Sequence, residues 1–299
     1  MAIIEKMNGE RYNLADYGFP SLKVNPVDIQ YDSENTIGRP GRNRVTRYHG
    51  VRALQLKLGL RAKDPTDCSL LRDELAAILD DAEDFYIYET IGETYQFEIP
   101  GQTGYSTAQD AFEWVPMLYK RWKVERINND GIEWDGLSGR RVIEFETSDL
   151  PYAETPFTTL DLEQTPLEWD TDMIGWGMGF DWDEDPPKYT FNTNTFSVKN
   201  YGNVDVNPRH MPLKIRLRGE FNENVTIKNL STGVTFVYNR PLDNSKELML
   251  DGINYLVDGS SVTGFTNKKL ITIKKGVNNF EITGGTVDSI SFEFPFYYL

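Results

Sequence analysis

Alternation of apolar and polar residues marks the first half of the chain as rich in β-strands. In VRALQLKLGLRA, every second position from Leu54 to Leu60 is leucine, and Gln55 and Lys57 lie on the opposite face. Such period-two alternation predicts a half-buried strand. The segments FYIYE, YKRWKVERIN and RRVIEFETSD predict further strands, so this half should be mainly β.

The first residues predict a hairpin. In IIEKMNGERYNL, Asn8 and Gly9 stand between two β-prone runs. An Asn-Gly pair can supply two residues with positive φ to a tight turn. We therefore expect a hairpin to open the fold.

One segment has helical spacing instead. In DPTDCSLLRDELAAILD, an apolar stripe recurs every three or four residues, at Leu71, Leu75, Ile78 and Leu79. Asp67 can accept hydrogen bonds from the free N–H groups of a first turn. The pattern predicts one helix, from about Cys68 to Leu79.

Two segments lack a clear period. In YDSENTIGRPGRNRVTRYHG, glycine and proline interrupt the pattern and every charge after Glu34 is positive, which predicts a projecting loop or arm. Residues 151–189 contain five prolines, several glycines and a run of acids, which is typical of a junction between domains. We therefore divide the chain into a first domain at 1–150, a junction at 151–189 and a second domain at 190–299.

The second domain contains only strand patterns. They are HMPLKIRLRGEF, NVTIKNLSTGVTFVYN, ELMLDGINYLVDG, KLITIKKGVNNFEITGG and VDSISFEFPFYYL. Short runs separated by Gly and Asn turns are typical of an antiparallel sandwich.

Charge is segregated along the chain. The net charge is −15, and residues 142–187 hold thirteen acids and no Lys or Arg. Residues 38–63 hold eight Lys or Arg residues and no acid.

The aromatic content of 13% favours packed structure over disorder. We find no signal sequence and no apolar run of 18 residues, so we expect no membrane association. The single cysteine, Cys68, cannot form a disulfide within the chain, which favours a reducing compartment.

The sequence GWGMGFDWDED, residues 175–185, invites a chemical interpretation. Its three alternating glycines do not match the G-x-G-x-x-G fingerprint of dinucleotide sites, and the neighbouring carboxylates would repel phosphate. A calcium loop starting at Asp170 would have Ile174 at its fifth position and Asp181 where a glutamate belongs. An adventitious divalent-cation site stays open as an alternative to a solvated acidic junction, which we favour.

Catalytic motifs are also missing. Only two histidines exist, His49 and His210, and no nucleophile elbow, zinc-protease or phosphate-loop motif accompanies them. We therefore expect no enzyme, no catalytic residue, no cofactor and no metal site.

The basic segment is the candidate site. Its arginines could contact nucleic acid or the acidic surface of another subunit, or form a solvated hairpin. Because the same chain carries abundant acids, we favour a contact between subunits. The candidate interface residues are Arg39, Arg42, Arg44 and Arg47.

Four stretches, in this order along the chain, carry a resemblance to a known family. They are DCSLLRDELAAILDDAEDFYIYE, VIEFETSDLPYAET, FSVKNYGNVDVNPRHMPLKIRLRG and LITIKKGVNNFEITGGTVDSISFEFPFYYL. In these stretches the chain resembles the distal tail protein (Dit) family of siphophages that infect Gram-positive bacteria.

The resemblance implies a mainly β fold. An N-terminal β-sandwich or barrel-like domain with one helix would form a hexameric ring, and a C-terminal galectin-like antiparallel β-sandwich would follow it. Such a ring would join the tail tube protein to the tail-tip (tail-associated) protein, carry receptor-binding or other baseplate proteins, and let DNA pass without specific binding. It would belong to the distal end of the virion tail and assemble in the host cytoplasm. The acidic segment GWGMGFDWDED, residues 175–185, would then lie in the joint between domains.

One alternative comes from another class. Aromatic residues on a β-sandwich also suit a carbohydrate-binding protein or a glycosidase accessory module. No tryptophan follows Trp182, so the resemblance does not carry sugar binding over to the second domain.

Overall fold

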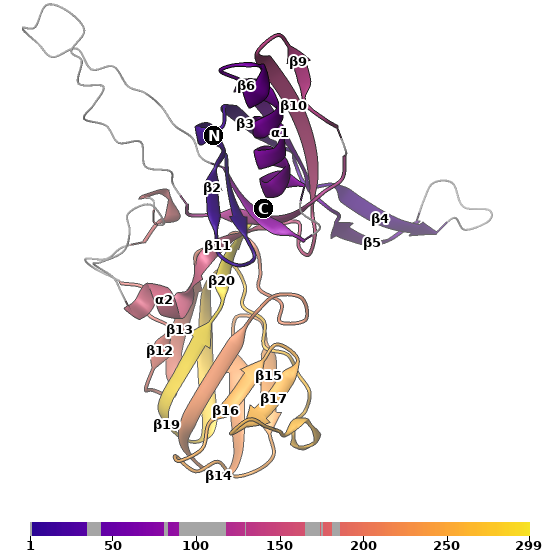
Figure 1. Ribbon diagram of the computed structural model, residues 1–299. Helices are drawn as coiled ribbons and strands as arrows, with labels where there is room; N and C mark the ends of the chain where they lie inside the picture. The colour runs from indigo at the N-terminus through magenta and orange to yellow at the C-terminus, as the bar shows by residue number, and fades with distance from the viewer. Residues whose placement is uncertain are drawn as a thin grey trace, which may run out of the picture. The chain divides into compact units, whose positions relative to one another are not determined.

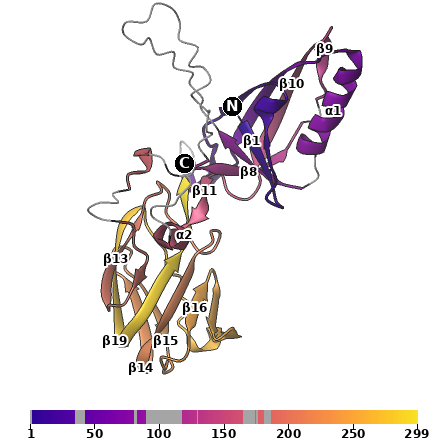
Figure 2. The same cartoon turned by 60° about the vertical axis from the view of Figure 1, so that its left-hand side comes forward.

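The chain folds as two compact units, each built mainly from antiparallel strands (Figures 1 and 2). One unit is Met1–Ala153 with Thr171–Ile174, and the other is Glu154–Asp170 with Gly175–Leu299. The computed structural model describes residues 2–34, 43–80, 83–89, 118–128, 130–164, 174, 176–180 and 186–299. The predicted mainly β fold class is confirmed.

The first unit is organised by one curved sheet. Its strands are β1 (Ala2–Lys6), β2 (Arg11–Asn13), β3 (Phe19–Val24), β6 (Ala53–Arg61), β7 (Phe85–Glu89), β8 (Arg121–Arg126), β9 (Glu133–Asp135) and β10 (Ser138–Thr147). They run in the order β2-β1-β7-β8-β10-β6-β3, with β9 on β10. The short helix η1 (Leu14–Asp16) brings β3 close to β1, so the sheet curls toward closure.

Strand β6 confirms the leucine prediction. It pairs with β10 over nine residues, from Ala53 opposite Glu146 to Arg61 opposite Ser138. All four leucines of its inner face are buried. This face forms a large part of the core of the first unit.

The opening hairpin forms, but its turn differs from the predicted one. β1 and β2 pair with Glu5 opposite Arg11, and the N–H of Gly9 donates to the carbonyl of Lys6 at 2.9 Å. Gly9 has φ +89°, while Asn8 does not adopt a positive φ. The loop is therefore the three-residue type, in which a turn ends on a left-handed glycine, and the expectation of two positive-φ residues was wrong.

Helix α1 (Pro65–Leu79) starts earlier than predicted. Asp64 is its N-cap, because the Asp64 carboxylate accepts from the N–H of Asp67 at 2.9 Å. Asp67 instead accepts from the N–H of Lys63 at 2.7 Å, outside the helix. Pro65 extends the helix because proline at the first helical position loses no hydrogen bond. Cap and start were therefore wrong, whereas the end at Leu79 was right.

A bridging carboxylate fixes the end of α1. Asp80 accepts from Arg141 at 2.6 Å and also pairs with Arg126. Arg141 is 5% exposed and also donates to the carbonyl of Asp130. These contacts join the helix to β8 and β10, so α1 lies along the sheet (Figures 1 and 2).

The predicted arm is a separate two-stranded sheet, β4 (Ile29–Glu34) and β5 (Asn43–His49). In Figure 1 it extends away from the main sheet of its unit. Neither strand pairs with another strand in the described part of the chain.

The second unit is built around two long strands, β14 (Lys214–Asn229) and β19 (Gly276–Glu293). The others are β11 (Ala153–Thr158), β12 (Thr190–Phe191), β13 (Thr195–Asn200), β15 (Val234–Tyr238), β16 (Leu248–Asp251), β17 (Asn254–Val257), β18 (Ser260–Ser261) and β20 (Pro295–Tyr298). Short helices are α2 (Thr159–Gln164), η3 (Trp176–Met178) and η4 (Thr263–Phe265). Neither α1, with 15 residues, nor α2, with six, could cross a membrane.

The β14–β19 ladder changes register near its middle. The strands that pair with the outer edges of β14 and β19 also change at this point. β12 and β16 flank one half, while β13 and β15 flank the other. Strands that pass a bulge can turn from one layer of a sandwich into the other, which is consistent with the predicted sandwich. One predicted strand is shorter than expected, because KLITIKK forms only an isolated bridge at Ile273 and β19 begins at Gly276.

Part of the predicted junction belongs to the second unit. Thr159 is fully buried, donates to the carbonyl of Phe292 at 2.6 Å and accepts from the N–H of Phe294 at 3.1 Å. Thr155 accepts from the N–H of Phe296, and Glu163 accepts two hydrogen bonds from Thr190. Residues 154–164 are thus joined to the C-terminal strands.

Glycines permit the bend of the long ladder. A Cβ on Gly285 would lie 2.0 Å from the carbonyl oxygen of Glu220, and one on Gly219 would lie 2.2 Å from that of Thr286. Gly284 has φ +103° and meets the carbonyl of Asn224 in the same way. Only glycine allows the two backbones to approach this closely.

We predict that Gly285→Ala destabilises the second unit by about 2 kcal/mol, because backbone must move to admit the methyl group. Gly264→Ala is the matched control, since a Cβ there meets nothing within 4 Å and neither glycine has a positive φ. Urea unfolding of both variants measures the difference. Equal stability would show that the ladder relaxes freely at the bend.

Candidate interaction surface

The arm places two of the four candidate arginines on one strand. In β5, Arg44 lies opposite Ser33 and Arg47 opposite Tyr31, with a register shift between Asp32 and Ser33. Arg47 is exposed, and its guanidinium lies 5.7 Å from the ring centre of Tyr31. Arg39 and Arg42 lie outside the described residues.

The arm is anchored to the main sheet at its root. The N–H of Asn25 donates to the carbonyl of Ala53, and the N–H of Gly50 donates to that of Asp28. Beyond the root, Tyr31 is 43% exposed and Tyr48 is 48% exposed. An arm with exposed aromatic rings beside arginine resembles the composition of protein interfaces more than that of a solvated hairpin.

The histidines are not arranged for catalysis. His49 Nδ1 lies 2.9 Å from the hydroxyl of Tyr152, and the two rings pack edge to face. His210 is exposed in a loop of the second unit. The described residues contain no group of three or more His, Cys, Asp or Glu side chains that could hold a metal ion, and Cys68 is a free, half-buried thiol.

Residues 165–173, 175 and 181–185 of the predicted junction lie outside the described residues, including the aspartates at 170, 172 and 181 of the suggested cation site. Within GWGMGFDWDED, residues 176–180 are described. The ring of Phe180 packs on that of Tyr201 at 4.6 Å and lies 6.1 Å from that of Phe296. Phe180, in the middle of this segment, therefore packs within the second unit, and the role of the segment as a joint stays a prediction.

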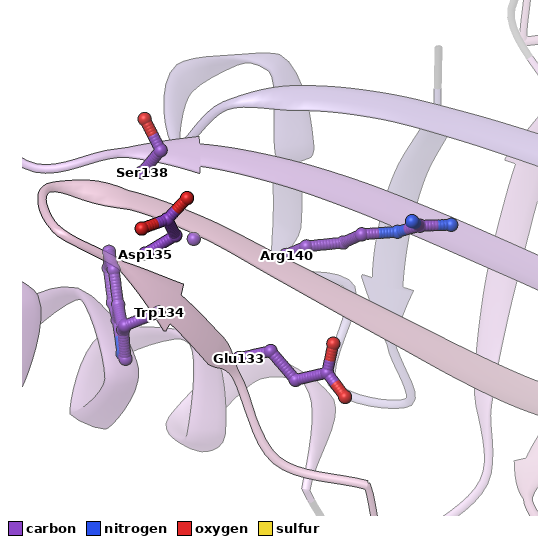
Figure 3. Close-up of a pocket in the computed structure, with 6 residues that line it drawn as sticks. Glu133, Trp134, Asp135, Ser138 and Arg140 are labelled. Atoms are coloured by element: carbon purple, nitrogen blue, oxygen red, sulfur yellow. The ribbon is translucent and has the colours of Figure 1, made fainter.

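A shallow hollow lies beside the turn between β9 and β10 (Figure 3). Its lining is Glu133, Trp134, Asp135, Ser138, Gly139 and Arg140. The labelled side chains point in different directions rather than toward a common centre (Figure 3). Binding sites for small molecules need a few polar groups that converge, so this hollow has no evident chemistry.

A buried ionic cluster that the sequence did not reveal lies between β1, β2, β7 and β8. Glu5 is 7% exposed and accepts from Arg11 and Arg121 at 2.5 Å each, and from the hydroxyl of Tyr88 at 2.8 Å. Arg121 also stacks on the ring of Tyr86 at 3.7 Å. Glu5 and Arg121 are 116 residues apart, so no local pattern could have paired them. This cluster fastens the opening hairpin to the sheet.

Comparison with known proteins finds one matching family model and several matching solved structures. Residues 7–111 match the family model described as phage tail protein RIFT-related domain. No curated protein sequence matches the chain. Among solved structures, the fold is similar to the SPP1 Dit (gp 19.1) protein, described as a paradigm of the hub adsorption apparatus of phages infecting Gram-positive bacteria. That match has a TM-score of 0.63 and 13% identity and covers 100% of both chains.

A chain of the phage P2 baseplate in its activated conformation with calcium matches more weakly. Its TM-score is 0.39 at 8% identity, over 99% of this chain and 97% of that one, which is too low to support an argument. The similarity to SPP1 Dit establishes the fold over the full length, and it agrees with the family resemblance expected from the sequence.

The Glu5 cluster makes stability sensitive to alkaline pH. Burial raises the pKa of Tyr88 to about 12, and the neighbouring charge of Glu5 adds to the rise. Since a tyrosine in an unfolded chain titrates near pH 10, stability is complete below about pH 10 and falls as the pH rises toward 12. We predict that the free energy of unfolding of Tyr88→Phe falls less steeply across this interval than that of the wild type. Urea unfolding at several pH values measures both slopes; equal slopes would contradict this assignment.

Proposed function

We propose that the chain is a distal tail protein, a structural component of a phage tail whose copies form a hexameric ring. The ring would join the tail tube protein to the tail-tip protein and carry receptor-binding or other baseplate proteins. The observation that carries the proposal is the similarity of fold to SPP1 Dit over the whole chain. The family match to a phage tail domain at residues 7–111 supports it independently.

The charge distribution supports association between copies. Residues 1–141 carry a net charge of −5, residues 142–187 carry −13 and residues 188–299 carry +3. Within this distribution, the arm is a basic element on an acidic molecule. Opposite charges on different surfaces of one chain favour head-to-tail contacts, which close into a ring when the rotation closes.

A structural, non-enzymatic role suits the described residues. The hollow beside β9 and β10 has no convergent polar groups, and the described residues contain no group of three or more His, Cys, Asp or Glu side chains that could hold a metal ion. The same proposal implies partners other than a second copy, a position at the distal end of the virion tail, and assembly in the host cytoplasm. The acidic segment would be the joint between the ring-forming domain and the outer sandwich.

Carbohydrate binding is the competing function. Among the described residues of the second unit, Phe265 is the exposed large aromatic side chain, at 43%. The guanidinium of Arg240 lies 4.0 Å from the centre of its ring and covers one face. A sugar platform needs a free aromatic face, and Arg240 occupies one of the two faces of Phe265.

We predict that the purified protein forms hexamers of the 34.3 kDa chain, or a monomer–hexamer equilibrium that shifts toward monomer as salt rises. Light scattering over a range of concentration and salt measures this. A chain that stays monomeric with all tail partners present and binds glycans would support the carbohydrate-binding alternative instead.

We predict that reversing the charge of the arm weakens the ring. Replacing Arg39, Arg42, Arg44 and Arg47 by glutamate should shift the equilibrium toward monomer, because the arm would then face acids with like charge. The control is Lys268→Glu with Lys269→Glu, two exposed positions of the second unit with no carboxylate within 4.0 Å in the described structure. Unchanged assembly of the arm variant would remove the arm from the interface.

We also predict that the assembled ring binds duplex DNA weakly at physiological salt. Each fixed cation that contacts a phosphate increases the affinity for DNA in a salt-dependent way, and tight binding would hinder passage through a channel. Fluorescence anisotropy of labelled duplex DNA tests this. Tight binding would contradict passage without specific contact.

A further inference from the structure

Arg52 is buried without an anionic partner. The residue is 7% exposed, and its Nε is enclosed and has no hydrogen-bond acceptor. The two terminal nitrogens make no hydrogen bond or ion pair in the described structure, and they keep contact with solvent. Burial lowers the pKa of Arg52 from its ordinary value, which reflects the lack of a compensating charge.

Two other largely buried guanidinium groups in the first unit are compensated. Arg141, which is 5% exposed, pairs with Asp80, and Arg121 pairs with Glu5. Removing a charge from water is costly unless a counter-charge and hydrogen bonds replace the hydration. In the single chain, the burial of Arg52 therefore carries a desolvation penalty that no ion pair offsets, whereas ion pairs offset it for Arg141 and Arg121.

The backbone holds Arg52 in a fixed place at the root of the arm. Its N–H donates to the hydroxyl of Thr147 at 3.0 Å, and its carbonyl accepts from the N–H of Thr147 at 3.0 Å. Thr147 is 2% exposed and ends β10. The position of Arg52 is therefore set by the β6–β10 ladder rather than by a loop.

The residues around this root have the character of an interface. Val51 is 44% exposed, and Tyr48 and Tyr31 of the arm are about as exposed. Arginine and tyrosine side chains dominate the energy of many protein interfaces, where surrounding apolar contacts exclude water. An enclosed guanidinium at the root of this arm, whose terminal nitrogens keep contact with solvent, is suited to receive an anion.

We propose that Arg52 receives a carboxylate from a second copy of this chain at the contact made by the arm. The inference rests on the proposed ring and identifies a residue that completes its contact. Charge complementarity favours a second copy, because the chain carries a net charge of −15 and residues 142–187 hold thirteen carboxylates without one cation. A planar guanidinium can bind a carboxylate through two parallel hydrogen bonds, which would satisfy both terminal nitrogens.

Arg52→Met in the full-length chain tests the proposal. Methionine keeps much of the volume and removes the uncompensated charge, so the monomer should be as stable as the wild type or more stable. The dissociation constant of the assembly should rise about 30-fold or more, because the partner carboxylate is left without its cation. Sedimentation velocity measures assembly, and urea unfolding under conditions in which both chains are monomeric measures stability.

Arg72→Met is the matched control. Arg72 is exposed on α1 and pairs with Asp73, so this variant loses the same charge away from the arm. It should assemble as the wild type does. Arg52→Lys should assemble with intermediate affinity, since lysine keeps the charge but loses the two-pronged geometry.

Each result decides between the proposals. If the wild type forms the ring and Arg52→Met forms it with the same affinity, the inference about Arg52 is wrong and the ring stands. If Arg52→Met destabilises the monomer, Arg52 is a structural residue and the inference is wrong. If the wild type stays monomeric under all conditions, both the ring and the role of Arg52 are overturned.

Discussion

The β6–β10 ladder is the interaction on which the first unit depends. Its nine paired residues bury the leucine face of β6, and β10 carries the β9 turn at one end. Arg141 of β10 holds the end of α1 through Asp80. At the other end, the ladder leads directly into Thr147 and Arg52, from which the arm departs. Because these features share one hydrogen-bonded ladder, the arm starts from a well-anchored base. Its own strands pair only with each other in the described structure.

The charges of the first unit fall into two groups with different consequences. Glu5 and Asp80 each join two guanidinium groups, and these contacts connect segments that are far apart along the chain. Arg52 and the exposed Arg47 make no ion pair in the described structure, although Arg47 lies near a tyrosine ring. Compensated charges stabilise the fold of one copy, whereas charges without a partner in that copy are candidates for contact with another. The single-chain structure thereby separates residues that fold the unit from candidates that assemble it.

The second unit takes β11 and α2 from the first part of the predicted junction, in addition to the strands that follow residue 189. Thr155, Thr159 and Glu163 join residues 154–164 to the C-terminal strands and to Thr190. The connection between the units is thus shorter than composition alone suggested, because a segment rich in proline can still form a strand and a short helix when its polar side chains satisfy the backbone. The bend of β14 and β19 depends in turn on glycines at which any side chain would meet backbone oxygen.

The sequence by itself determined the mainly β class, the leucine face of β6, the end of α1, the arm and the strand-rich second half, because local periodicity and turn residues carry that information. It also carried the family resemblance with which the fold agrees. Only the tertiary structure decided the cap at Asp64, the form of the opening turn, the placement of residues 154–164 and the partners of Glu5 and Asp80. It alone showed that Arg52 is buried without a partner. Those features depend on contacts between residues far apart along the chain, and burial and pairing of that kind leave no periodic trace in the sequence.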